Sequence, residues 1–591
     1  MNMKFIILAL GLIVTATNLR AQKTDYDWLI GIDPLNDPQD STYGISHVDF
    51  NQEPPGIYYD GNITLNFYAC DVSICDAEGN LLFYSNCIEI FNAAHEPLNN
   101  SQGFNDYPFH DGYLLTGLPL VQGILGFKLE NGNNQYCLIH EKIDWEEING
   151  EYDLISVGLF YSIIDMDENG GLGNVIENGI PLIEDTLAAG MLTATRHANG
   201  RDWWIITPEY NTNRYYRILL TPQGPQLMDK QEIGEPTING LGQAVFSPDG
   251  SWYVRNNLLG GPADDDYLDI YRFDRCSGLL SEHIRFPYGN GVNAGGGVAI
   301  SPNNRFLYVS HRNHVYQYDL WATDIQESKD TVSIYDGYLD DGFNPTTFFL
   351  AQLAPDGKVY LSCTNGTRWL HIINNPNGQG DACEFAQRGI HLPTVNFTSL
   401  PNFPNYRLGP IDSSPCDTLG LDNHPLANWR YDIDTLNPLL VELTDNSFYE
   451  PTEWSWDFGD GGASNEMNPV HTFPTSGAYN VCLTVSNQYG SDTLCRQVTV
   501  GVTAAGETKK EAFSLRFYPN PAKHELTFEV SSDKDFQGEL RIIDFNGKII
   551  KQGLLRTGTN KLSFDLPSGV YFVTLQSKEG VIFRDKVVIL R

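Results

Sequence analysis

The chain has 591 residues, with 74 Asp and Glu against 37 Lys and Arg, and its formal net charge at pH 7 is −37. So negative a surface repels nucleic-acid phosphates and anionic lipids, because affinity for those polyanions depends on Lys and Arg contacts, and we expect no nucleic-acid partner. Aromatic residues make up 12%, with 55 Gly and 32 Pro, which predicts an all-β protein of several domains with many turns.

The first residues predict a secretory signal peptide over 1–21. Lys4 precedes an apolar run at 5–14, and a more polar stretch follows that ends in Ala21 and Gln22, so we expect cleavage after Ala21. The run is too short to span a bilayer, and no later stretch approaches the roughly 18 uninterrupted apolar residues of a membrane helix. We therefore expect no integral membrane segment in the mature chain.

One pattern returns six times over 24–412: a polar turn, then a short strand of aromatic and aliphatic residues. Successive turns lie 50 to 68 residues apart, a period typical of four-stranded propeller blades. The turns are marked by Gly79, Gly132, Gly200, Gly250, Asn304 and Gly357. We predict a β-propeller of seven blades, with six as the alternative; two packed β-sandwiches would not explain the period.

The turns of the Ser247-Pro248-Asp249-Gly250 kind resemble those of lactonase-like and YVTN-repeat propellers. The resemblance covers the repeat and implies a fold, not a catalytic centre. Propellers commonly close by pairing terminal strands, and we expect 27–32 to pair with the region near Arg407.

Ten cysteines in an exported chain predict disulfides rather than metal sites, since none shows Cys-x-x-Cys spacing. Cys482 and Cys495 lie symmetrically about the turn at 487–490, so they should face each other across adjacent strands. Similar arithmetic pairs Cys70 with Cys87 and Cys363 with Cys383. The other four cysteines receive no partner.

After an irregular linker at 413–427, residues 428–500 form a separate unit. It contains Trp-Ser-Trp-Asp-Phe-Gly-Asp-Gly at 454–461 and Gly-Ala-Tyr-Asn-Val at 477–481, and with these motifs it closely resembles a PKD domain, an immunoglobulin-like β-sandwich. Alternation predicts that one buried face of a strand contains Tyr479, Val481, Leu483 and Val485. Trp456 and Phe458 are the expected core partners of this face.

A linker at 501–512 leads to a small β-sandwich at 513–591. It has a Tyr-Pro-Asn-Pro entry, a late strand and a terminal basic strand, with the key residues Tyr518, Pro519, Asn520, Pro521, Gly569, Tyr571 and Lys586. With these features the segment resembles the type A C-terminal sorting domain of type IX secretion substrates. The resemblance implies a Bacteroidetes-like source and the type IX machinery as a partner.

No linear motif assigns a catalytic residue, a cofactor or a metal ligand. His140-Glu141 lacks the second His of a zinc protease, and His197, His311 and His314 neighbour strand turns, where local hydrogen bonding is the simpler role. Propeller active sites gather from distant blades, so an enzyme is not excluded.

The sequence therefore predicts an exported protein, secreted or held at the outer-membrane surface, that binds or adheres to an unknown glycan or protein ligand. Its propeller would be the recognition domain and the C-terminal domain the export signal. The alternative is a propeller-borne hydrolase or lactonase-like enzyme tethered by its PKD module, and a channel lined by small or apolar groups would favour binding.

Overall fold

The computed structural model describes residues 23–589 apart from the following segments: 34–41, 149–150, 238–240, 258–265, 290–295, 435, 502–513, 519–521, 532–536, 544–548, 565, 568 and 578–579. The chain divides into two compact units, one of 1–434 with 440–472 and 479–498, the other of 499–591 with 435–439 and 473–478. The described part is all-β, and its helical elements are short 3-10 turns: η1 (Pro108–Tyr113), η2 (Asn169–Gly171), η3 (Gln326–Ser328) and η4 (Gly380–Cys383).

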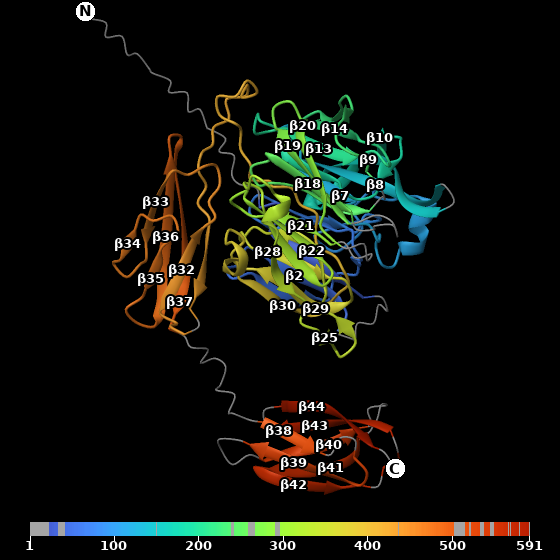
Figure 1. Cartoon of the computed structure of the whole chain (residues 1–591), viewed down its shortest axis with the longest axis vertical. Coiled ribbons are helices and arrows are strands. Elements are labelled where there is room, and N and C mark those ends of the chain that lie inside the picture. Colours follow the sequence, from blue (N-terminus) through green and yellow to red (C-terminus); the bar gives the residue numbers. More distant parts are fainter. Residues whose placement is uncertain are drawn as a thin grey trace, which may run out of the picture. The chain divides into compact units, whose positions relative to one another are not determined.

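Seven antiparallel sheets follow one another through the described residues between 27 and 396, coloured blue to yellow in Figure 1. In chain order they are β1 (Asp27–Ile32), β2 (Gly44–Asp49), β3 (Gly56–Asp60); β4 (Val72–Cys75), β5 (Leu81–Ser85), β6 (Ile90–Asn92); β7 (Ile124–Lys128), β8 (Gln135–Ile148), β9 (Glu151–Asp165), β10 (Asn174–Ile183), β11 (Leu187–Ala188); β12 (Thr193–Arg196), β13 (Trp203–Pro208), β14 (Arg214–Thr221), β15 (Gly224–Leu227), β16 (Gln231–Glu232); β17 (Gly242–Phe246), β18 (Trp252–Asn257), β19 (Tyr267–Asp274), β20 (Leu279–Pro287); β21 (Val298–Ile300), β22 (Phe306–His311), β23 (His314–Asp319), β24 (Asp330–Ile334); and β27 (Phe348–Leu353), β28 (Val359–Cys363), β29 (Thr367–Ile373), β30 (Phe385–Asn396). A small hairpin, β25 (Leu339–Asp340) and β26 (Asn344–Pro345), precedes the last sheet.

The repeated turns have one common place in these sheets. Each of the six turn residues joins the first strand of a sheet to the second, as Gly250 does between β17 and β18. All six have φ between 61° and 92°, the left-handed region that Gly and Asn adopt most readily. Residues 33–43, between β1 and β2, are not among the six instances of the sequence pattern, so seven sheets show only six marks.

The sheets form a β-propeller, because their first strands lie side by side in sequence order. Contacts join β1 to β4, β4 to β7, β12 to β17, β17 to β21, and β21 to β27. The last sheet returns to the first: Trp28 of β1 packs edge-on against Tyr360 of β28 at 5.6 Å, and the hydroxyls of Ser46 and Thr394 lie 2.6 Å apart. Strand β30 of the last sheet also contacts β1, β2 and β3, so the two ends of the series meet.

The expected pairing of β1 with the region near Arg407 is wrong. In the structure β1 pairs with β2, and residues 401–410 form no strand. Pro401, Pro404 and Pro410 remove backbone donors from this stretch, so it cannot supply a continuous ladder.

The next unit of sequence folds as a two-layer sandwich. One sheet contains β31 (Trp429–Ile433), β32 (Leu440–Asp445) and β35 (Val470–Thr472); the other contains β34 (Ala463–Ser464), β33 (Glu453–Asp457), β36 (Gly477–Asn487) and β37 (Gly490–Val500). Val481, Leu483 and Val485 are fully buried, and Trp456 packs edge-on against Trp429 at 5.4 Å. The alternation predicted for β36 is therefore present.

The C-terminal strands form a second sandwich. Its sheets are β38 (Ser514–Tyr518), β39 (Glu525–Ser531), β42 (Gly558–Ser563), and β41 (Ile549–Arg556), β40 (Gln537–Ile543), β43 (Gly569–Ser577), β44 (Gly580–Ile589). Leu526 and Phe528 of the first sheet share a buried core with Leu540, Ile542 and Val573 of the second.

The disulfides agree with the hairpin arithmetic where both cysteines are local. Cys70 is bonded to Cys87, and Cys482 to Cys495. A third bond joins Cys276 to Cys416 across 140 residues, a pair that the sequence left unassigned.

The expected bond between Cys363 and Cys383 is absent, and both are buried free thiols. The reason is the register of β28 with β29, in which Val359 lies opposite Ile373. Cys383 follows the end of β29, so it lies beyond the end of the strand pair at which Val359 and Ile373 face each other. Cys363 is the last residue of β28 and lies at the opposite end of the pair.

Candidate binding site in the propeller channel

A stretch of chain that follows the last sheet, residues 398–408, occupies the middle of the propeller; we call it the channel segment. Asn402 Nδ2 donates to the carbonyl oxygens of Ile124 at 3.1 Å and Leu192 at 3.0 Å. Its Oδ1 accepts a bond of 3.2 Å from Gln122 Nε2. One Asn side chain thus bonds to residues in or just before the first strands of two sheets, so the chain itself fills this part of the channel.

A cavity of about 480 Å³ remains at the channel end where the repeated turns lie; we call it the channel cavity. Its walls are the first strands β12, β17, β21 and β27, and Phe403, Asn405 and Arg407 of the channel segment lie at its base. The loop 445–450 of the following sandwich, in the same compact unit, contributes the remaining side. This volume falls within the range of roughly 300 to 1,000 Å³ that small-molecule sites occupy.

A buried ion pair lies at the base of the channel cavity. Arg407 Nη2 donates to Asp25 Oδ2 at 2.7 Å, and the two side chains are only 6% and 5% exposed. Burial alone would lower the pKa of Arg407, but the charge of Asp25 and its hydrogen bonds raise that pKa above the ordinary value. The Arg407 guanidinium also lies 5.0 Å from the ring of Phe448. The charge of Arg407 is thus paired with Asp25 within the fold.

Side-chain amides from neighbouring sheets form the rim. Asn304 Oδ1 accepts a bond of 2.9 Å from the backbone N–H of Asp249, and Asn377 Oδ1 accepts one of 3.0 Å from that of Asn303. Among the residues that the structure describes, none accepts a bond from the Nδ2 group of Asn304 or Asn377. Each oxygen links one sheet's turn to the next, while each NH₂ group is available to a ligand.

The loop 445–450 is held in a constrained conformation. Tyr449 and Glu450 have φ of 63° and 54°, a left-handed backbone that costs non-glycine residues on the order of 1–3 kcal/mol each. Asn446 Nδ2 donates to the Asp356 carbonyl at 2.7 Å, and Asn487 Nδ2 donates to that of Tyr449 at 3.0 Å. These bonds anchor the loop beside the propeller turns, and such strain concentrates at ligand-binding loops.

Two acids that line the channel cavity, the exposed Asp249 and the buried Asp445, already have partners. Asp249 Oδ1 accepts bonds from Ser247 Oγ at 2.5 Å and from the Ser251 N–H at 2.9 Å. Asp445 Oδ2 accepts one from Trp454 Nε1 at 2.8 Å, and burial raises its pKa. Groups held in this way orient the walls. The chemistry left for a ligand is that of amides, hydroxyls, aromatic rings and aliphatic side chains, together with the exposed carboxylate of Glu450.

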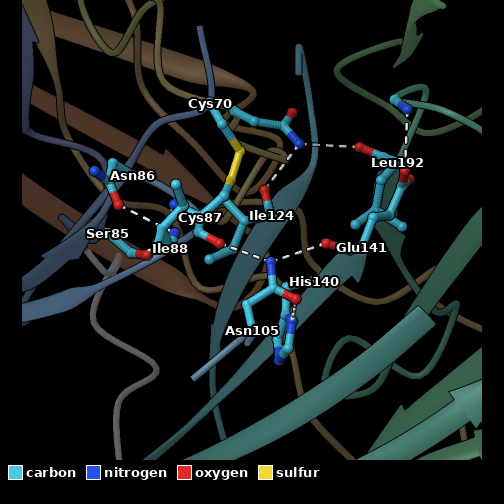
Figure 2. Close-up of a disulfide and its surroundings, with 12 residues drawn as sticks. Cys70, Ser85, Asn86, Cys87, Ile88, Asn105, Ile124, His140, Glu141 and Leu192 are labelled. Carbon is cyan, nitrogen blue, oxygen red and sulfur yellow. Dashed lines mark hydrogen bonds between the residues drawn. A yellow bond between two sulfur atoms is a disulfide. The ribbon is translucent and has the colours of Figure 1, made fainter. Parts of the chain in front are cut away.

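A second polar cluster lies beside the Cys70–Cys87 disulfide, as Figure 2 shows. Asn105 Nδ2 donates to the carbonyls of Cys87 at 2.6 Å and Glu141 at 2.9 Å, and its Oδ1 accepts from His140 Nδ1 at 3.0 Å. Burial lowers the pKa of His140 to about 3 and raises that of Glu141 well above its ordinary value. Both side chains are completely buried, so the cluster stabilises the fold.

The histidines near strand turns have local contacts. His197 Nδ1 accepts a bond of 2.9 Å from the Asn199 N–H, and the His314 ring stacks on Tyr316 at 5.6 Å. His311 Nε2 lies 2.8 Å from Asp266 Oδ2, and these side chains are 9% and 0% exposed. No three His, Cys, Asp or Glu side chains gather in a metal-binding arrangement within the described residues.

The sorting-domain motif divides between core and surface. Tyr571 of β43 is 8% exposed and its hydroxyl donates to the Pro567 carbonyl at 3.1 Å, whereas Tyr518, at the end of β38, is 47% exposed. Of the other motif residues, Gly569 lies on β43 and Lys586 on β44. Pro519, Asn520 and Pro521 lie outside the described residues, as does the expected signal cleavage site at Ala21 and Gln22.

Sequence reasoning missed the channel segment, the Asp25–Arg407 pair and the loop 445–450. The available signal was the run Leu-Pro-Asn-Phe-Pro-Asn at 400–405, which is too apolar and aromatic for an exposed linker. Its partners lie hundreds of residues away, so no local pattern could identify them.

Two family models match parts of the chain. Residues 433–502 match the PKD domain, and residues 516–590 match the secretion system C-terminal sorting domain. The chain therefore carries a PKD domain and a type IX sorting domain, and it is exported to the cell surface or the surrounding medium. No helix among the described residues has both the length and the apolar character needed to cross a membrane.

Similar proteins cover parts of the chain. Collagenase ColQ1 of Bacillus cereus is 41% identical over 56 residues, which are 10% of this chain and 6% of the collagenase. The PKD1 domain of the Vibrio cholerae metalloprotease PrtV is 30% identical, covers 13% of this chain and 96% of its own, and has a TM-score of 0.12. A putative 6-phosphogluconolactonase of Bacteroides fragilis is 13% identical, covers 65% and 99%, and has a TM-score of 0.31. The seven sheets described above, and not this likeness, define the propeller.

Proposed function

We propose that this chain is an exported recognition protein that binds a ligand in the channel cavity. In this proposal residues 24–412 are the recognition domain, with the seven sheets as blades, and residues 428–500 complete its binding site. Residues 513–591 direct export through the type IX machinery, after removal of a signal peptide at 1–21. Adhesion to a surface glycan or protein would follow from binding.

The observation that carries the proposal is the chemistry of the channel cavity. It joins two folded domains, has the size of a small-molecule site, and presents amide, hydroxyl and aromatic groups. Arg407 is neutralised by Asp25, and Asp249 and Asp445 are bonded within the walls. Groups in such fixed bonds are poorly placed to move protons or to attack a substrate, so reversible binding is the better use of this site.

The test is an array of glycans and surface proteins probed with the mature chain. Leu353, a half-buried side chain of β27, lines the channel cavity, and Leu353→Trp would place an indole in it. We expect the wild type to retain one class of ligand and Leu353→Trp to lose it, with circular dichroism confirming that both are folded. Equal binding by the two proteins would refute the channel cavity as the site.

The alternative function, a hydrolase, has one specific observation in its favour, the buried pair of His311 and Asp266. An imidazole held by a carboxylate is a common general base. Turnover of a glycan or lactone that is lost in His311→Ala and retained in Leu353→Trp would favour this alternative over recognition.

A further inference from the structure

The side chains around the channel cavity favour a particular class of ligand, and the argument rests on the proposed function. Asn304 and Asn377 offer NH₂ donors from two adjacent turns, and their oxygens are already bonded to backbone N–H groups. Amide groups are neutral at every pH and match hydroxyl groups, which both donate and accept. The rim therefore suits a ligand rich in hydroxyls.

Aromatic rings provide the second feature. Phe403 enters the channel cavity from the channel segment, and Phe448 and Tyr449 enter it from the loop 445–450. Such rings give broad apolar faces, and the hydroxyl of Tyr449 adds a polar tip. A pyranose ring has the complementary surface, with C–H groups on its faces and hydroxyls around its edge.

Charge disfavours anionic ligands. Arg407 is the basic residue among those that line the channel cavity, and its guanidinium is engaged by Asp25, so an anionic ligand would find no free counter-charge. The whole chain is strongly acidic, which repels anions further. A cationic ligand would meet the exposed carboxylates of Asp249 and Glu450, which makes a cation the main competitor of a neutral sugar.

We propose that the channel cavity binds a neutral sugar unit of a glycan, held by the rim amides at its hydroxyls and by Phe403, Phe448 and Tyr449 at its apolar face. The volume of about 480 Å³ accommodates a short oligosaccharide rather than a protein surface. Recognition of the glycan would then require both domains, since the amides come from propeller turns and two of the rings from the sandwich loop.

The test uses calorimetric titration of the mature full-length chain with defined probes. The neutral probes are cellobiose, maltose and N,N′-diacetylchitobiose; the charged probes are a digalacturonic acid and tetralysine. We expect at least one neutral disaccharide to bind and both charged probes to fail. Binding of no neutral disaccharide, or of a charged probe alone, would overturn the proposal.

Two variants locate the binding. Asn304→Asp keeps the oxygen that accepts from Asp249 and replaces the donor with a charged oxygen, so we expect at least a 10-fold weaker affinity for the neutral sugar. Asn211→Asp is the matched control: Asn211 is exposed, has a left-handed φ of 53° like the 61° of Asn304, and does not line the channel cavity. We expect it to bind as the wild type does.

The outcomes separate the ligand class from the site. Suppose that tetralysine binds, that Asn304→Asp strengthens this binding and that Leu353→Trp abolishes it. The neutral sugar is then the wrong ligand class, and the channel cavity stands as the binding site. If the neutral sugar binds equally to wild type, Asn304→Asp and Leu353→Trp, the site itself is wrong and the proposed function fails with it.

Discussion

Replacing Asp269 with Asn should destabilise the propeller more than any exposed charge substitution. Asp269 on β19 is fully buried and forms an ion pair with Arg255, whose Nη2 lies 2.7 Å from its Oδ2. It also accepts hydrogen bonds from His283 Nε2 at 2.5 Å and Arg285 Nε at 2.8 Å. Burial alone would raise the pKa of Asp269, but the charge of Arg255 and the bonds from His283 and Arg285 hold it below its ordinary value. The carboxylate is therefore ionised and central to a buried network.

The magnitude follows from the partner that remains. Arg255 is completely buried, so Asp269→Asn leaves a guanidinium in the core without its counter-charge. Removing one partner of a buried ion pair costs about 3–5 kcal/mol. With an unfolding entropy of about 2.1 cal/mol/K per residue over a propeller of this length, that loss corresponds to a fall in Tm of about 5 °C.

The assay is differential scanning calorimetry of the mature chain, read at the propeller transition. Asp229→Asn is the control, because Asp229 is exposed, and it should leave Tm within about 1 °C. The double variant Asp269→Asn/Arg255→Gln should recover part of the loss, since it removes the unpaired cation. A single variant as stable as Asp229→Asn, or a double variant no better than the sum of its parts, would refute the reasoning.

The pH dependence gives an independent check of the same network. Since the folded pKa of Asp269 is depressed, its stabilisation is present above the ordinary pKa and is lost as pH falls through the folded value. The difference in Tm between wild type and Asp269→Asn should therefore shrink in strong acid. A constant difference from neutral to strongly acidic pH would contradict this assignment.

Other predictions concern the domain junction, the channel and export. Burial, then a neighbouring acid, raises the pKa of Glu53 to about 7, so stability should fall as pH rises from its ordinary pKa to about 7, and Glu53→Gln should flatten Tm between pH 5 and pH 8. Cys276→Ser opens a cross-link to Cys416 over 140 residues and should cost about 4–5 kcal/mol in guanidinium unfolding, whereas an unchanged midpoint would contradict the constraint. Asn402→Ala leaves two channel carbonyls without this donor, which should cost about 1–3 kcal/mol and speed amide exchange in the channel; exchange at the wild-type rate would count against the bonds. Deleting 513–591 should leave the rest folded in the periplasm, and normal protease accessibility at the cell surface would disprove this.

The local features were predictable because their signals lie within a few residues. The six left-handed turns need Gly or Asn at one position, and all six connect the first two strands of a sheet. The bond between Cys482 and Cys495 follows from a hairpin with a clear centre. Cys363 and Cys383 mislead because strand register, which no spacing reveals, places them at different ends of the β28–β29 pair.

By itself the sequence determined the all-β class, the repeat of the propeller, the PKD domain and the sorting domain, because turn chemistry and alternation act between neighbouring residues. Only the tertiary structure decided that residues 398–408 fill the channel, and that Asp25 meets Arg407 across 382 positions. It also decided that the loop 445–450 borders the channel cavity. Those contacts arise when the ring closes and brings distant segments together, so the binding site is a property of the closed propeller and its neighbouring sandwich rather than of any stretch of chain.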